Sequence, residues 1–172
     1  CSVVITGRNE KTLKDAAEEI GKTAIPMVWN ASDIDLAAAK INEAAEILGG
    51  LDIVVNNAGI FSFCDILSTP VERIERVIFL HDLTTTKTCR LYAEDMIGRG
   101  GGRILNMSSY SIWMPYPGLS LYSASKAYLK SFSVAFSKEV EERGVTVTAI
   151  CPAGIATDLY GLSPRLQRFG LK

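Results

Sequence analysis

Short apolar runs alternate along the chain with stretches in which apolar residues recur at helical spacing. Five of these runs are rich in branched residues and predict strands: "SVVIT" (2–6), "AIPMVW" (24–29), "LDIVV" (51–55), "RILNM" (103–107) and "VTVTAIC" (145–151). The third run is apolar enough to predict a strand that is buried on both faces.

The stretches between these runs predict helices. Asn9 is expected to cap the first helix and Gly21 to end it. Ser32 is expected to cap the second. Pro70 suits the first position of a third helix, whose apolar spacing runs unevenly as far as Met96.

A last helix is predicted over residues 123–143. It is expected to bury Tyr128, Phe132, Ala135 and Phe136 and to stop at Gly144. Strands that alternate with helices predict an α/β fold, a doubly wound, Rossmann-like parallel sheet in three αβα layers. No linker interrupts the pattern, so residues 1–172 are read as a single domain.

Composition supports one globular domain and gives no sign of a polyanionic partner. The 172 residues are 48% hydrophobic and 22% charged, with a net charge of -1. There is no basic stripe for nucleic acid and no apolar run of the roughly 18 residues that a membrane span needs. The scattered cysteines (Cys1, Cys64, Cys89 and Cys151) argue against a disulfide scaffold or zinc site and favour the cytoplasm.

The stretch "YSASK" (122–126) places a phenol and an ammonium group one helical turn apart. A free tyrosine, with a pKa of about 10, is a poor acid near neutral pH. The positive charge of Lys126 would favour the phenolate and make Tyr122 a usable acid/base. Alternatively, Tyr122 is a packed aromatic and Lys126 a solvated helix residue.

Four motifs in order, "NNAG" (56–59), "NMSS" (106–109), "YSASK" and "CPAGIAT" (151–157), resemble the short-chain dehydrogenase/reductase family. Each lies at the carboxyl end of a predicted strand or at the start of the next helix, the edge where α/β sheets bind ligands. The resemblance implies hydride transfer between a nicotinamide and a ketone or secondary alcohol, as in 3-oxoacyl reductases. It also implies a homodimer or homotetramer formed through residues 70–96 and 123–143.

The resemblance implies that Ser109 orients the substrate, Tyr122 transfers the proton and Lys126 also binds the nicotinamide ribose. Ser108 would then be a turn residue. In the loop that joins Ser109 to Tyr122, Trp113, Met114 and Tyr116 either line a substrate pocket or pack against a helix. The resemblance further implies a cofactor site made by Asn30, Ala31, Asn56, Asn57, Ala58, Gly59, Pro152, Ala153, Gly154, Ile155 and Thr157.

Arg8 bears on the choice of cofactor. It follows Gly7, which ends the first predicted strand at the position where an NAD-preferring relative would usually carry an acid for the ribose hydroxyls. A guanidinium group there could bind a 2′-phosphate, which favours NADP(H) over NAD(H). The alternative is an exposed arginine paired with Glu10.

His81 is the sole histidine of the chain. It occupies the position where relatives commonly have an asparagine that holds a proton-relay water. It could serve as that relay, or a register shifted by one residue would place Asp82 there. The third possibility is a histidine packed inside the helix.

The chain departs from the family pattern at both ends. "TGRNEKTLKD" lacks the family's spaced glycines, and by alignment the chain starts at the second strand of the fold. We expect an absent central strand to split the sheet and leave two apolar edges unpaired. A fragment of this kind is expected neither to fold alone nor to hold cofactor. Such departures leave a second hypothesis, a non-catalytic nucleotide-binding or regulatory domain.

Overall fold

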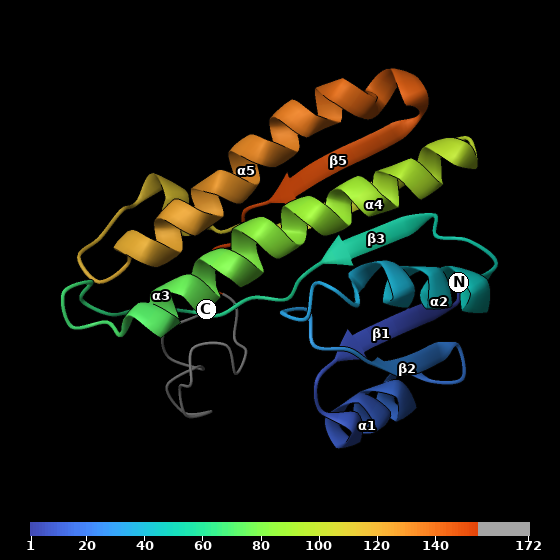
Figure 1. The fold of residues 1–172 in the computed structure, drawn as a ribbon, viewed down its shortest axis with the longest axis horizontal. Coiled ribbons are helices and arrows are strands. Elements are labelled where there is room, and N and C mark those ends of the chain that lie inside the picture. The colour runs from blue at the N-terminus through green and yellow to red at the C-terminus, as the bar shows by residue number, and fades with distance from the viewer. Residues whose placement is uncertain (155–172) are drawn as a thin grey trace.

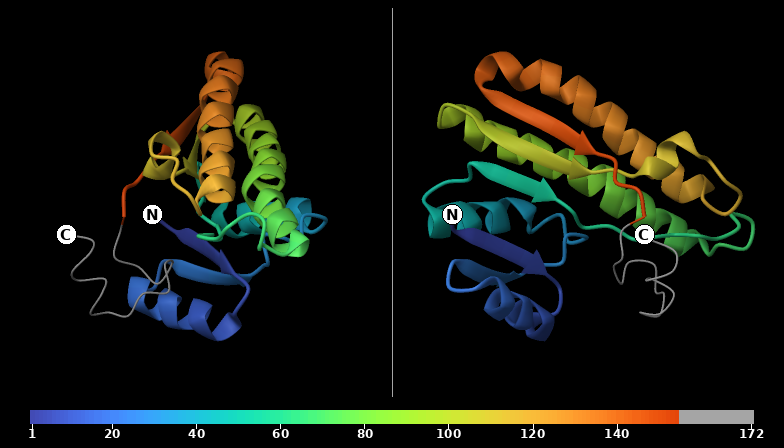
Figure 2. Two further views of the ribbon diagram at one scale, coloured as in Figure 1. Left: turned by 90° about the vertical axis from the view of Figure 1, so that its left-hand side faces the viewer. Right: turned by 180° about the vertical axis from the view of Figure 1, so that it is seen from behind.

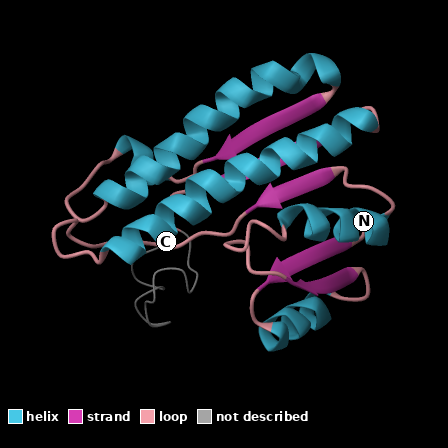
Figure 3. Ribbon diagram, in the orientation of Figure 1, coloured by secondary structure: helices cyan, strands magenta, loops and turns pink. Residues whose placement is uncertain are grey.

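The computed structural model describes residues 1–154, which form five parallel strands and the helices that connect them (Figures 1 and 3). The strands lie within about two residues of the predicted runs at each end. They are β1 (Val3–Gly7), β2 (Ala24–Val28), β3 (Ile53–Asn56), β4 (Gly102–Met107) and β5 (Val145–Ile150).

The longer helices follow the predicted pattern. They are α1 (Glu10–Ile20), α2 (Ala37–Leu48), α3 (Val71–Ile78), α4 (Thr85–Gly98) and α5 (Ser120–Val140). Short 3₁₀ turns, η2 (Tyr110–Trp113) and η3 (Glu141–Arg143), precede and follow α5. Among the described residues, none of the helices combines the length and the apolar character that crossing a membrane requires.

Two predicted helix signals for α1 are confirmed, and one for α2 is wrong. The side chain of Asn9 accepts a hydrogen bond from the Thr12 amide, and Gly21 ends α1 with a φ of +104°. The second helix begins only at Ala37, without a side-chain cap. Ser32 instead lies in a turn, where its amide donates to Asn30 Oδ1, so this local turn displaces the expected helix start.

A π-helical segment, η1 (Phe79–Thr84), joins α3 to α4 and explains the uneven apolar spacing. Each π turn contains more residues than an α turn, so the buried face changes register within the segment. His81 is fully buried there, whereas the next residue, Asp82, is half-buried. The π-helical segment therefore determines that His81, and not Asp82, points into the interior.

The sheet is split into two parts, as the expected absence of a central strand predicted. β1 pairs with β2, and β3, β4 and β5 form a second sheet, without hydrogen bonds between β1 and β3. A cavity of about 430 Å³ separates the facing edges of β1 and β3. Two parallel edges of this kind leave backbone donors and acceptors unpaired.

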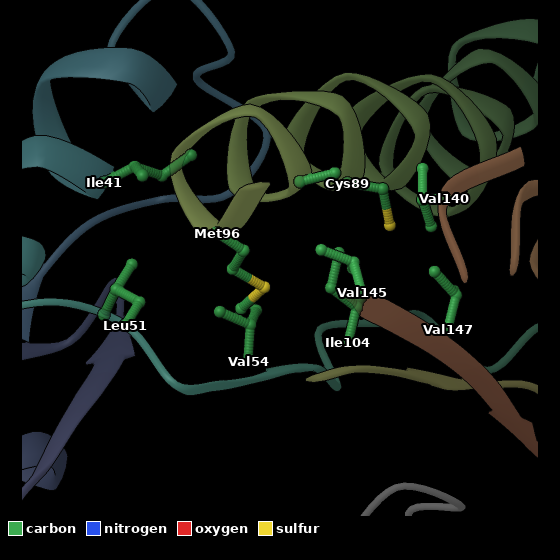
Figure 4. Packing of buried hydrophobic residues seen from close by; sticks show 10 residues of the cluster. Ile41, Leu51, Val54, Cys89, Met96, Ile104, Val140, Val145 and Val147 are labelled. Carbon is green, nitrogen blue, oxygen red and sulfur yellow. The ribbon is translucent and has the colours of Figure 1, made fainter. Parts of the chain in front are cut away.

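The main core lies between the three-stranded sheet and the helices α2, α4 and α5. Figure 4 shows its buried side chains, among them Val54 of β3, Met96 of α4 and Val145 of β5. Seen from behind, the described chain leaves the other face of this sheet bare (Figure 2). Ile53 and Val55 are 64% and 53% exposed on that face, so β3 is buried on one face only, contrary to expectation.

Helix α5 buries a more polar face than predicted. Its buried side chains include Tyr122, Ser125, Lys126 and Ser133. Tyr128 is 41% exposed instead of buried, and it begins a row of stacked rings that continues through Phe132 and Phe136. The prediction of an apolar buried face was wrong because polar side chains can be buried where they find hydrogen-bonding partners inside the protein.

Candidate active site

The predicted catalytic residues and most of the predicted cofactor contacts lie at the carboxyl edge of the three-stranded sheet. Asn56 ends β3 and residues 57–59 follow it, residues 108–109 follow β4, and residues 152–154 follow β5. Helix α5 runs past this edge with Tyr122 and Lys126 near its beginning. Parallel strands bring these loops together because all their carboxyl ends lie on the same side.

Tyr122 is buried beside two aromatic side chains and one cation. The Phe61 ring meets its ring edge-on at a centroid distance of 5.1 Å, and the His81 ring lies at 6.0 Å. Lys126 Nζ lies 5.8 Å from the centre of the Tyr122 ring. The four-residue spacing therefore places the ammonium group next to the phenol.

Lys126 is only 5% exposed and is held by the strand that precedes Ser108. Its Nζ donates a hydrogen bond to the Met107 carbonyl oxygen at 2.9 Å. Burial lowers the pKa of Lys126 to about 8, while the nearby Asp82 carboxylate acts in the opposite direction. Because about 8 is still above neutrality, Lys126 is mostly charged at pH 7.

Ser109 and Tyr122 line one pocket of about 210 Å³. Its other walls include Phe61, Met114 and the segment 152–154. The neighbouring Ser108 is buried and donates to the Lys126 carbonyl oxygen at 2.7 Å. Of the two serines, Ser109 is thus the one that shares a pocket with the tyrosine.

Residues 56–59, which end and follow β3, have different structural roles. Asn56 donates to Asn106 Oδ1 at 2.8 Å inside the sheet, so its side chain holds β3 to β4. Asn57 and Ala58 are exposed and line the cavity between the two sheets. A side chain at Gly59 would place its Cβ 3.1 Å from His81 Nε2 and 3.4 Å from Lys126 Nζ, so close packing favours glycine there.

The residues predicted to contact the adenosine half of the cofactor lie near the ends of β1 and β2. Ala31 lines the cavity between the sheets, and Asn30 is exposed. Arg8 is also exposed, and within residues 1–154 it forms no ion pair. Glu10 bonds Lys14 at 2.7 Å, so the alternative pairing of Arg8 with Glu10 is not formed.

His81 has both ring nitrogens at hydrogen-bonding distance from protein atoms. Nε2 accepts from the Ile60 amide and Nδ1 lies next to Ser125 Oγ, each at 2.9 Å. Burial, together with the nearby charge of Lys126, lowers the pKa of His81 to about 3. Burial raises the pKa of the adjacent Asp82 to about 6, although Lys126 counteracts it.

Three contributors were not identified from the sequence. Met107 acts through its backbone carbonyl, for which side-chain patterns give no signal. Phe61 lies beyond the "NNAG" motif, in a loop whose path the pattern does not predict. Ser125 had a usable signal, since it lies three residues after Tyr122 on one face of a helix. Ile155 and Thr157, also predicted as cofactor contacts, lie outside the described residues.

Comparisons with known proteins are consistent with this geometry. The model of the short chain dehydrogenase family matches residues 1–165. The Mycobacterium tuberculosis protein named "Probable oxidoreductase EphD" is 37% identical over 161 residues, which cover 91% of this chain and 27% of the relative. The 3-oxoacyl-[acyl-carrier-protein] reductase FabG of Chlamydia muridarum is 33% identical over 176 residues, covering 99% of this chain and 71% of the relative.

Solved structures resemble the described fold. A short-chain type dehydrogenase/reductase from Mycobacterium marinum superposes with a TM-score of 0.82 at 27% identity. That match covers 88% of this chain and 64% of the other. The chain therefore spans about a quarter of the mycobacterial EphD protein and about two thirds of this solved relative.

Proposed function

The chain belongs to the short-chain dehydrogenase/reductase family, and on that premise we propose that its protein is an NADP(H)-dependent oxidoreductase. It would interconvert a ketone and a secondary alcohol. The observation that carries the proposal is the placement of Tyr122 and Ser109 in one pocket, with the buried Lys126 ammonium 5.8 Å from the phenol ring. Nucleotide binding alone needs neither a proton donor nor a buried cation beside it.

Each of these residues has a part in stabilising negative charge on a carbonyl oxygen. Tyr122 transfers its phenolic proton to that oxygen, and Lys126 stabilises the phenolate that remains. Ser109 donates a second hydrogen bond to the same oxygen, where charge develops during reduction. In the oxidative direction, the phenolate accepts the alcohol proton.

The lining of this edge fits a nicotinamide dinucleotide. When bound, the cofactor supplies or accepts the hydride. The close backbone approach at Gly59 and the exposed Asn57 and Ala58 leave a wall without bulky side chains. Lys126 would bind the ribose, Ala31 would face the adenine end, and the segment 152–154 would close the nicotinamide end.

The test is turnover by the whole protein with NADPH and a panel of ketones that includes a 3-oxoacyl thioester. Tyr122→Phe should lower turnover by at least about a hundredfold, because it removes the proton donor. Cofactor affinity, measured by titrating NADPH fluorescence, should change less than about twofold, a difference below 0.5 kcal/mol. Tyr128→Phe on the same helix is the matched control, since its hydroxyl contacts only Thr86 among the described residues.

Two results would contradict this mechanism. One is a Tyr122→Phe protein that keeps wild-type turnover. The other is wild-type protein that binds NADPH but reduces none of the carbonyl compounds, which would favour the non-catalytic nucleotide-binding domain. The thioester is included because one relative is named a 3-oxoacyl-[acyl-carrier-protein] reductase.

The preference for NADP(H) is supported by Arg8. It is exposed at the end of β1, and Glu10, its expected partner, is bonded to Lys14 instead. Arg8→Ala should lower the ratio of kcat/KM for NADPH over NADH by about tenfold, the scale of one charge-assisted hydrogen bond. Lys22→Ala, an exposed cation at the opposite end of β2, should leave the ratio unchanged. An unchanged ratio in Arg8→Ala would argue against a 2′-phosphate contact.

Assembly and location stay predictions. The stacked and partly exposed row of Tyr128, Phe132 and Phe136 on α5 supports a homodimer or homotetramer built through this helix. The cytoplasm remains the compartment that we propose from the four unpaired cysteines.

A further inference from the structure

His81 lies between the loop that follows β3 and the helix that carries the proposed acid. Its side chain has 0% exposure. Nε2 is 2.9 Å from the amide nitrogen of Ile60, on the loop side. Nδ1 is 2.9 Å from Ser125 Oγ, on α5. One imidazole therefore bridges Ile60 and Ser125, which are 65 residues apart in the sequence.

The partners of the ring fix where its proton lies. A backbone N–H can only donate, so Nε2 must be the unprotonated acceptor of the Ile60 amide. Ser125 Oγ donates its own proton to the Tyr122 carbonyl oxygen at 2.9 Å, which leaves its lone pairs for a donor. Nδ1 must therefore carry the proton. The Ile60 amide and Ser125 Oγ therefore both favour the neutral imidazole that carries its proton on Nδ1.

The surrounding charges oppose a second proton on the ring. Lys126 on α5 is the nearby cation, and a Cβ built on Gly59 would touch both Nε2 and the lysine ammonium. Asp82 is adjacent in the same segment, and the Tyr122 phenol ring stands edge-on to the imidazole. Burial and Lys126 together keep the pKa of His81 at about 3, so the imidazole is neutral throughout the physiological range.

We propose that His81 is a positioning residue that ties the Gly59–Ile60 backbone to the turn of α5 bearing Tyr122 and Lys126. This inference rests on the proposed function, because it assigns the wall formed by residues 57–59 to the cofactor. It departs from the expectation of a proton relay, because neither ring nitrogen is left to exchange a proton with a water molecule. His81 thereby keeps the cofactor wall and the proton donor in register.

The tautomer can be tested without turnover. Nitrogen-15 labelling of histidine in the whole protein identifies the imidazole signals of His81 as those that disappear in His81→Gln. We expect the proton on Nδ1 and no second protonation of the ring between pH 5 and pH 9. A ring protonated on Nε2, or one that titrates near an ordinary histidine pKa of about 6.5, would overturn the proposal.

Cofactor affinity tests the positioning itself. His81→Gln keeps an acceptor near the Nε2 position but loses the donor to Ser125, whereas His81→Leu loses both bonds. The dissociation constant of NADPH should rise about fivefold for each hydrogen bond lost, so more in Leu than in Gln. Ser125→Ala should match His81→Gln, and the double variant should be no worse than either, because both break the same bond.

Val77→Ala is the matched control, since Val77 is also fully buried nearby on α3 but lies outside this hydrogen-bond chain. It should lower stability without changing the NADPH dissociation constant or the tautomer. If His81→Gln and Ser125→Ala bind NADPH as wild type does, while turnover falls and its pH profile moves, His81 is a relay and the proposal is wrong. If His81→Leu fails to fold, the NADPH dissociation constants of His81→Gln and Ser125→Ala still test the positioning role.

The outcome is separable from that of the proposed function. A wild-type protein that binds NADPH but reduces no carbonyl compound contradicts the enzymatic proposal alone. In that case the imidazole tautomer and the NADPH dissociation constants of the variants still confirm or overturn the positioning role.

Discussion

At the scale of single residues, the site depends on a charge that is costly to bury. Lys126 is almost completely enclosed. Within residues 1–154 the Met107 carbonyl oxygen, the Tyr122 ring and the Asp82 carboxylate offset the loss of water around its ammonium. A protein retains such a group where the charge is needed, because burial disfavours the charged form. Stability and the proposed chemistry therefore make opposite demands on Lys126.

This conflict gives a pH-dependent prediction. The folded-state pKa of Lys126, about 8, lies below its unfolded value of 10.5. The folded state therefore binds this proton less tightly, and stability should rise between pH 8 and pH 10.5. At pH 7 the lowered pKa of Lys126 costs the folded state about 3 kcal/mol, and Lys126→Met removes this cost. The variant also loses a hydrogen bond worth about 1 kcal/mol, so it should be more stable than wild type by about 2 kcal/mol.

Urea unfolding of both proteins at pH 7 and pH 9.5 measures the difference. At pH 9.5 most of the advantage of Lys126→Met should be gone, because the folded wild type has released the proton. Lys130→Met is the matched control for the loss of a lysine from this helix, since Lys130 is only half-buried one turn further along α5. A variant that is less stable than wild type at both pH values would contradict this account of Lys126.

At the scale of elements, a buried polar network joins β3, β4 and α5 behind the proposed site. Asn106 of β4 accepts from Asn56 of β3 at 2.8 Å and donates to Ser133 of α5 at 2.9 Å. Ser133 in turn donates to the Leu129 carbonyl oxygen at 2.6 Å. A network in which each member has a partner fixes the relative position of the elements, because any shift leaves a buried polar group unsatisfied.

Asn106→Ala should therefore destabilise the protein by about 2 to 4 kcal/mol, since it removes the oxygen that accepts from the Asn56 amide and the group that donates to Ser133 Oγ. Chemical unfolding gives the change in free energy. In a double-mutant cycle with Ser133→Ala, the two changes should not add, because both remove the same bond. Asn42→Ala on the exposed side of α2 is the control. A loss for Asn106→Ala as small as that of this control would refute the network.

At the scale of the whole molecule, the chain consists of two parts whose sheets are not joined by hydrogen bonds. β1, β2 and α1 form one part, and the three-stranded sheet with α4 and α5 forms the larger one (Figure 1). An isolated two-stranded sheet is marginally stable in water, and here its β1 edge faces a cavity. The three-stranded part has a continuous buried core.

We expect the isolated 172-residue chain to unfold without a single cooperative transition. In hydrogen exchange followed by mass spectrometry, the amides of β1 and β2 should exchange before those of β4 and β5, because the smaller part opens at lower cost. The pairing of β3 with β4 serves as an internal reference within the same sample. A cooperative melt from a chain of intact mass 18.7 kDa, with equal protection in both parts, would contradict this prediction.

Much of the fold followed from local patterns in the sequence. Branched apolar runs gave the five strands, Asn9 and Gly21 gave the ends of α1, and the four motifs indicated the family. These signals are local because strand propensity, capping and turn conformation depend on neighbouring residues. The split of the sheet could also be predicted, since strand order follows from the family resemblance.

The tertiary structure decided what each side chain contacts. The π-helical segment turned His81 inward and left Asp82 half-buried, and no local pattern specifies that register. Burial of Lys126 and Ser125, and exposure of Tyr128, reversed the apolar pattern of α5 because partners distant in sequence satisfy the buried polar groups. Sequence thus determined which elements form and where the chemistry lies. Only the packing of distant segments determined which groups are charged, enclosed or bonded to one another.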